Sequence, residues 1–178
     1  MNDVSQDVPR VVGARWLSEH AEQTDRAGAL RIVDTRWYLQ HKSGREEYAR
    51  GHIPGAVFLP LEDITAEQGP GRHPIPSAEK FAEAMRAAGI SQETHVVAYD
   101  DAGGSIAARL AWLLRRYGHR RVSVLDGGLQ AWTAEGLALS TLSTHSKDAQ
   151  AHGDFVAAPD PGVSVVDKAY VNAARARV

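Results

Sequence analysis

Short apolar runs alternate with amphipathic stretches along most of this chain. Buried strands are predicted where apolar, often β-branched runs are followed by Asp or Pro, at residues 30–33, 57–59, 96–99 and 122–125. Helical periodicity fills intervals between them, most clearly in residues 77–88 and 105–114. Strands that alternate with helices at this spacing predict an α/β layered domain with a mainly parallel sheet.

The most informative stretch is the junction between the predicted strand 96–99 and the predicted helix that starts at Ser105. The residues between them form a Gly-containing loop, Asp100-Asp101-Ala102-Gly103-Gly104. A strand that feeds a helix through such a loop points several backbone N–H groups into one small space, where the helix dipole adds positive potential. The loop therefore predicts an anion cradle for a thiolate, a phosphate or an oxyanion, or for an aspartate of the chain itself.

Two polar features flank other predicted strands. Asp34 and Arg36 follow the strand 30–33 with one residue between them, which favours a structural ion pair over the sheet. The charged stretch 45–50 predicts a short helix that ends at Gly51, and the turn 52–56 leads into the next strand.

The chain divides into three parts. The first domain is predicted at residues 10–139, followed by a polar, non-periodic linker or wrap-around segment at 140–162. Residues 165–171 then repeat the pattern of residues 11–17, two valines followed by an aromatic and an aliphatic residue at the same spacing. This similarity predicts that a second copy of the domain begins at 163–178 and is truncated, with chance similarity as the alternative.

Composition narrows the classes of function. The 178 residues are 43% hydrophobic and 24% charged, with a net charge of −2 and dispersed Lys and Arg, which argues against a nucleic-acid partner. No run approaches the roughly 18 apolar residues of a membrane span, and the N-terminal segment lacks a signal-peptide core, so no membrane association and a cytoplasmic location are predicted.

The absence of cysteine excludes more kinds of chemistry than any other feature of the composition. The chain contains no cysteine, which excludes disulfides, thiolate metal sites and catalysis by a cysteine of this chain. The eight histidines form no helical metal-binding pair, so neither a metal nor a cofactor is predicted. An aspartate nucleophile of the phosphotransferase kind is disfavoured, because it would need a second aspartate two positions on, a threonine soon after and a lysine to bind phosphate, and residues 99–103 provide none of these. A phosphate-loop nucleotidase is disfavoured because residues 103–109 contain no Gly-Lys-Ser/Thr sequence.

Four motifs in this order and spacing resemble the rhodanese superfamily, and more narrowly the N-terminal half of the two-domain thiosulfate and 3-mercaptopyruvate sulfurtransferases. The resemblance covers about residues 11–139, and it rests on the segments Asp34-Thr35-Arg36-Trp37-Tyr38, Arg50-Gly51-His52-Ile53-Pro54-Gly55-Ala56, Tyr117-Gly118-His119 and Val124-Leu125-Asp126-Gly127-Gly128-Leu129-Gln130-Ala131-Trp132. It implies a rhodanese-like α/β fold, a five-stranded mainly parallel sheet with helices on both faces.

The resemblance also implies two such domains, with one active cysteine at a strand end of the second. Here the corresponding strand end carries Asp100, with Asp101 as the alternative, and the loop Asp100, Asp101, Ala102, Gly103, Gly104 and Ser105 is a degenerate anion cradle. In mercaptopyruvate-type members an acidic residue and a histidine of the N-terminal half face the partner domain's active site, and these positions match Glu62 and His73.

The resulting prediction is a non-catalytic rhodanese domain that supports sulfur transfer by a cysteine of a second rhodanese domain, with thiosulfate or 3-mercaptopyruvate as the family substrates. The alternatives are a cysteine-free anion-binding or regulatory module without chemistry, and a purely structural role for Asp100 and a solvated His73.

Overall fold

The computed structural model describes residues 8–21, 29–40, 42–142 and 153–175. Strands and helices alternate along the chain as predicted: β1 (Val11–Val12), α1 (Ala14–His20), β2 (Leu30–Asp34), α2 (Gly44–Arg50), β3 (Val57–Phe58), the 3₁₀ helix η2 (Leu61–Ile64), α3 (Ala78–Ala87), β4 (His95–Tyr99), α4 (Ser105–Arg116), β5 (Val122–Leu125), α5 (Gly128–Ala134) and α6 (Lys168–Arg175).

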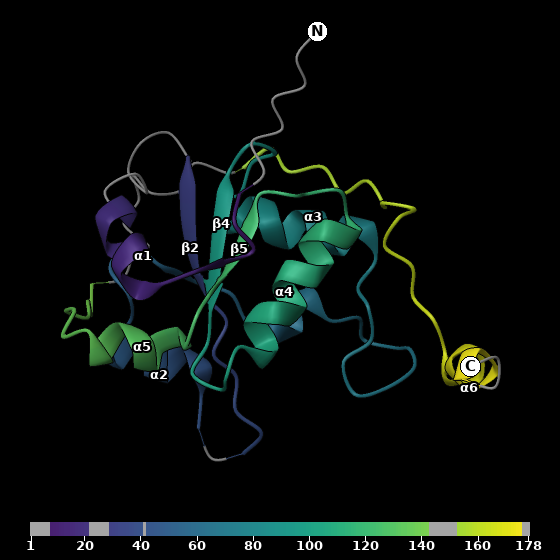
Figure 1. The fold of residues 1–178 in the computed structure, drawn as a ribbon, viewed down its shortest axis with the longest axis horizontal. Helices are drawn as coiled ribbons and strands as arrows, with labels where there is room; N and C mark the ends of the chain where they lie inside the picture. The colour runs from purple at the N-terminus through teal and green to yellow at the C-terminus, as the bar shows by residue number, and fades with distance from the viewer. Residues whose placement is uncertain (1–7, 22–28, 41, 143–152, 176–178) are drawn as a thin grey trace, which may run out of the picture.

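The five strands form one parallel sheet in the order β1-β5-β4-β2-β3. Figure 1 shows β5, β4 and β2 side by side in this sheet. Because all strands run the same way, the loops that follow them meet at one edge of the sheet, where ligands of open α/β folds bind. The register pairs Asp34 with Tyr99, so the polar ends of β2 and β4 lie side by side. The prediction of a five-stranded parallel α/β fold is confirmed.

Helices cover both faces of the sheet, because successive strand residues point to opposite sides. On one face, Val96 and Ala98 of β4 pack with residues of α3 and α4. On the other face, Val97 and Tyr99 pack with side chains of α1, α2 and α5, among them Leu17, Tyr48 and Trp132. Figure 1 shows the same division, with α1, α2 and α5 on one side of β4 and α3 and α4 on the other. This two-sided burial explains why β4 is apolar throughout.

Residues 153–163, here called the strap, lie over the α3–α4 face. Phe155 is fully buried in this core, with its ring 5.8 Å from that of Phe81 and 5.7 Å from that of His119. Main-chain hydrogen bonds fasten the strap at several points, including Gly153 N to Arg86 O at 3.0 Å and Ala158 N to Tyr117 O at 3.1 Å. The polar stretch at this position is therefore a wrap-around segment in its second half, while residues 143–152 lie outside the described residues.

Helix α6 has no buried residue and stands apart from the sheet and its covering helices (Figure 1). Tyr170 and Val171 are 63% and 44% exposed. No helix in the described ranges is long and apolar enough to cross a membrane; α4, with 12 residues, is the longest of them.

Candidate functional site

The carboxylate of Asp100 fills a ring of backbone amides at the end of β4. One oxygen accepts hydrogen bonds from the N–H groups of Ala102 and Gly104, both at 2.8 Å. The other accepts from Ile106 at 2.8 Å and Ala107 at 2.9 Å, in the first turn of α4. With 1% of its surface exposed, Asp100 occupies the space that an external anion would need. The helix dipole adds to the four charge-assisted bonds and stabilises the carboxylate there.

The glycines of two loops make this geometry possible. Gly104 precedes α4 with a φ of +83°, which turns its N–H towards Asp100. Gly128 begins α5 with a φ of +55°, and a Cβ there would lie 2.2 Å from the carbonyl oxygen of Asp100. The Asp126-Gly127-Gly128 motif therefore packs its backbone directly against the Asp100 loop, and the N–H of Leu129 donates to Asp100 O at 3.0 Å.

Asp101 has a different environment from Asp100. Its carboxylate points to the loop after β2, where it accepts a hydrogen bond of 2.5 Å from the hydroxyl of Tyr38. Burial, assisted by this bond, raises the pKa of Tyr38. The side chain of Gln130 donates to the main-chain oxygen of Asp101 at 2.6 Å. Asp101 thus connects its own loop to the loop after β2 and to helix α5, and of the two aspartates Asp100 is the one inside the amide ring.

A buried ion pair holds the loops above β2 together. Arg36 donates to both oxygens of Asp34, at 2.7 Å for the closest contact, and to the carbonyl oxygen of Gly51 at 2.8 Å. Burial opposes the charge of Arg36, but the carboxylate of Asp34 outweighs it and the pKa of Arg36 is raised. The hydroxyl of Tyr99 donates to Asp34 at 2.7 Å and accepts from the N–H of Ile53 at 3.2 Å. The structural ion pair that the spacing of Asp34 and Arg36 predicts is present, and it anchors the 50–56 motif.

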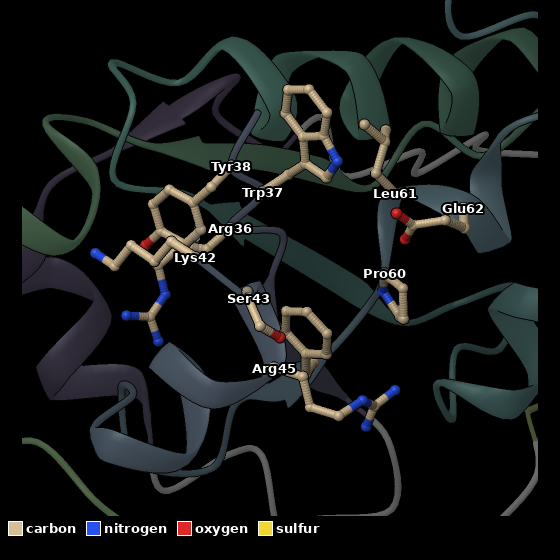
Figure 2. A pocket seen from close by; sticks show the side chains of 11 residues that line it. Arg36, Trp37, Tyr38, Lys42, Ser43, Arg45, Pro60, Leu61 and Glu62 are labelled. Carbon is tan, nitrogen blue, oxygen red and sulfur yellow. The ribbon is translucent and has the colours of Figure 1, made fainter. Parts of the chain in front are cut away.

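A half-open pocket of about 280 Å³ lies beside this network. Figure 2 shows Trp37 and Tyr38 on one side of it and Arg45 and Pro60 on the other, with the carboxylate of Glu62 turned towards the space between. Lys42 also lines it, 4.3 Å above the ring of Tyr38 and 3.0 Å from a carboxylate oxygen of Glu47. The pocket therefore combines aromatic surface with groups of both charges.

The two residues expected to face a partner domain both lie near Trp37. Glu62 is exposed in η2 and lines the pocket with Trp37, while the half-buried ring of His73 meets the indole edge-on at 5.1 Å between centroids. Among the described residues no hydrogen bond joins Glu62 to His73. The structure therefore places both side chains around one indole without forming a carboxylate–imidazole pair.

Arg109 fixes the backbone beside His73. Its guanidinium donates to the carbonyl oxygens of Ile64, His73 and Pro74 at 3.0–3.3 Å. Burial lowers the pKa of Arg109. Arg109 lies among the apolar residues of the helical stretch 105–114, and its sequence position alone does not reveal this role. A charged residue within an apolar helical stripe was the available signal, because a buried guanidinium requires acceptors.

Within the described ranges, no group of three or more carboxylate and imidazole side chains is arranged to hold a metal ion. The site is thus a closed amide ring occupied by a carboxylate, a buried ion pair, and an aromatic pocket with Glu62 and His73 beside it. These features define an α/β protein whose anion cradle has its amides taken by a carboxylate and carries no thiol nucleophile.

Comparison with known proteins gives the family. The model of the rhodanese-like domain matches residues 14–135, which is more than half of the chain. The 3-mercaptopyruvate sulfurtransferase of Escherichia coli is 37% identical over 161 residues, which cover 88% of this chain and 54% of that protein. The thiosulfate sulfurtransferase of Gallus gallus is 42% identical over 130 residues, 71% of this chain and 45% of that protein.

A solved structure agrees with this relationship. The crystal structure of SseA from E. coli, described as showing the rhodanese fold and catalytic mechanism of 3-mercaptopyruvate sulfotransferases, matches with a TM-score of 0.79 and 35% identity, covering 94% of this chain and 62% of that one. The chain belongs to the rhodanese family. It spans about half the length of the curated relatives it matches.

Proposed function

We propose that this chain is the non-catalytic rhodanese domain of a tandem thiosulfate or 3-mercaptopyruvate sulfurtransferase. Sulfur transfer would take place on a cysteine of a second rhodanese domain. The observation that carries the proposal is the Asp100 carboxylate, which accepts hydrogen bonds from four backbone amides at the strand end where the catalytic domains of the family place their cysteine.

The chemistry of a carboxylate supports an inactive cradle. A thiolate can accept a sulfane sulfur and pass it on as a persulfide, whereas a carboxylate at the same place cannot. The four amides would stabilise either anion, so replacing cysteine by Asp100 preserves the fold of the loop while removing the nucleophile.

Residues 163–178 are proposed as the beginning of the second domain. Helix α6 begins two residues after Val166, as α1 begins two residues after Val12, so the repeated valine pair is followed by a helix at the same spacing in both places. Val11–Val12 pair with β5, whereas Val165 and Val166 are 54% and 47% exposed, as expected for a strand without its sheet.

Glu62 and His73 are proposed to contribute to the partner domain's active site. Both lie beside Trp37 and neither is committed to a hydrogen bond with the other, so each can orient towards a group on the opposing domain. Imidazole is the side chain best suited to donate or accept, near neutral pH, the proton that moves during sulfur abstraction.

The alternative, a regulatory module that binds anions in the degenerate loop, is less well supported. Asp100 already takes the amide hydrogens that such an anion would use. A carboxylate in the ring also repels any second anion.

The proposal is tested with the chain alone and with a chimaera. Alone, the chain should form thiocyanate from thiosulfate and cyanide, and pyruvate from 3-mercaptopyruvate, only at the rate without protein. A chimaera in which it replaces the corresponding half of the E. coli relative should release pyruvate. His73→Ala should lower that rate by about 10²-fold, in the range of a lost acid–base group.

Glu62→Gln should also lower that rate. Glu67→Gln, an exposed carboxylate that follows η2, is its matched control and should leave the rate unchanged. Turnover by the chain alone that survives further purification would overturn the non-catalytic assignment. A folded chimaera whose pyruvate release is unaffected by His73→Ala would argue against the role of His73.

A further inference from the structure

A second pocket lies at the opposite edge of the sheet from the Asp100 loop. Its volume is about 340 Å³. It is formed where the segment before β1, the end of α4, the turn before β5 and the strap meet, and its lining residues are Val8, Arg10, Arg115, Arg120, Asp160, Gly162 and Val163. The pocket is thus separate from the sulfurtransferase-like site, which lies at the carboxyl ends of the strands.

Among the described residues, three arginines and one aspartate line this pocket, which gives this part of the lining a net charge of +2. The guanidinium of Arg120 lies 3.0 Å from a carboxylate oxygen of Asp160 and neutralises it. Arg115 donates to the carbonyl oxygen of Val122 at 3.0 Å, which fixes the position of its guanidinium. Arg10 is exposed and takes part in no ion pair within the described residues. The Arg120–Asp160 pair therefore neutralises one of the three guanidinium groups among the described lining residues.

Hydrogen bonds fix the backbone segments that surround the pocket. The carbonyl oxygen of Arg10 accepts from Val124 N at 2.9 Å, which attaches that segment to β5. On the strap, Asp160 N donates to Arg116 O at 2.7 Å, and the side chain of Asp160 accepts from Gly162 N at 2.8 Å. Arg116 also donates to Val163 O at 3.1 Å. Such a fixed frame reduces the entropy lost when a ligand binds.

We propose that this pocket binds the phosphate group of a small phosphate monoester. A phosphate monoester carries a charge of about −1.5 to −2 at neutral pH, which matches the net positive charge of the lining. Arginine binds phosphate oxygens with paired N–H donors, and Val8 and Val163 offer apolar contacts to the organic part. The ligand would connect the strap to the segment before β1. Among the described residues, no hydrogen bond joins these two segments directly.

The test is isothermal titration of the intact chain with glycerol 3-phosphate, and separately with inorganic phosphate, in a low-salt buffer without phosphate. Binding of glycerol 3-phosphate should weaken about tenfold in Arg10→Ala, the loss of one charge-assisted contact. Asp160→Asn should bind more tightly, because it frees Arg120 and removes the negative charge that the described lining residues carry. Arg72→Ala, an exposed arginine elsewhere, is the matched control and should bind as the unmodified chain does.

Absence of binding, or equal weakening by Arg10→Ala and Arg72→Ala, would overturn the proposal. Equal affinity for inorganic phosphate and glycerol 3-phosphate would assign the site to the free anion and remove the role of the two valines. A loss of affinity in Asp160→Asn with an unchanged melting temperature would contradict the charge argument. None of these outcomes bears on sulfur transfer, so the two proposals fail independently.

Discussion

At the scale of single residues, the anion in the ring of backbone amides after β4 is a side chain of the chain itself, the carboxylate of Asp100. The amides of Ala102, Gly104, Ile106 and Ala107 converge on Asp100, so its carboxylate serves as a cap at the start of α4. The carboxylate satisfies backbone groups of that first turn that would otherwise lack partners.

Replacing Asp100 should therefore cost stability. Asp100→Ala removes four charge-assisted hydrogen bonds and is expected to lower the free energy of unfolding by about 2–4 kcal/mol, measured by urea denaturation. Asp101→Ala is the control, because the carboxylate of Asp101 makes one hydrogen bond at a less buried position and should cost about 1 kcal/mol. Equal losses in the two variants would contradict the assignment of Asp100 to the amide ring.

A second residue makes the stability depend on pH. His95 is buried at the start of β4, and one of its ring nitrogens lies 2.8 Å from the hydroxyl of Ser123. Burial, with smaller contributions from Arg121, His119 and His20, lowers the pKa of His95 from 6.5 to about 4. The folded state therefore binds this proton less readily than the unfolded chain does.

Because the unfolded state takes up the proton first, stability should be fully present above about pH 6.5 and fall as the pH drops towards about 4. The loss is expected to reach about 3 kcal/mol at the lower end of that window. His95→Gln removes the titration and can keep a hydrogen bond to Ser123, so urea midpoints measured at about pH 7.5 and about pH 4.5 should differ less in this variant. An unchanged difference would show that His95 is not the group responsible.

At the scale of elements, the strap belongs physically to the domain it covers. Phe155 enters the α3–α4 core, and Gly153 passes so close to the end of α3 that a Cβ there would lie 1.8 Å from the carbonyl oxygen of Ile90. Arg86 donates to the carbonyl oxygen of Phe155 at 3.1 Å and holds the ring in place. A domain boundary placed at 139 omits these contacts.

Phe155→Ala should lower the free energy of unfolding by about 3–5 kcal/mol, because it leaves a cavity between Phe81 and His119. The neighbouring Val156 is 65% exposed, so Val156→Ala should change the free energy of unfolding by less than about 0.5 kcal/mol. Thermal unfolding followed by circular dichroism distinguishes the two. A small effect of Phe155→Ala would mean that the strap leaves the core without cost.

At the scale of the whole molecule, α6 is an element without a surface to pack on. Its exposed Tyr170 and Val171 form no contact with the buried cores, and an isolated helix of eight residues is only marginally stable in water. Its stability in a longer protein would have to come from another domain.

Shortening the chain to end at Val166 should accordingly leave the free energy of unfolding within about 0.5 kcal/mol of the original value. The strap contacts up to Val163 remain in such a chain. Urea denaturation of the two chains side by side provides the measurement. A loss above about 1 kcal/mol would imply that α6 contributes to the folded domain after all.

Much of the architecture follows from local patterns. The apolar runs and the helical periodicities predict β2, β4, β5, α3 and α4. The start of α3 is marked by Ser77, a residue type that favours helix N-termini, and its hydroxyl accepts from Lys80 N at 3.2 Å. These features are predictable because periodicity, caps and strand ends depend on residues a few positions apart. The absence of cysteine likewise excludes thiol chemistry by this chain on composition alone.

Tertiary structure alone determined the contacts between residues that are distant in sequence. Only the folded loop distinguishes Asp100 from Asp101, because the distinction lies in which carboxylate reaches the amides of α4 and which reaches Tyr38, 63 positions away. Three other features also depend on distant residues. Phe155 is buried in the core, and Arg109 donates a hydrogen bond to the carbonyl oxygen of His73. One pocket is lined by residues from separate segments, Arg10, Arg115, Arg120 and Asp160. No local pattern encodes these contacts, because the parallel sheet and its crossover helices bring together segments that the sequence keeps far apart.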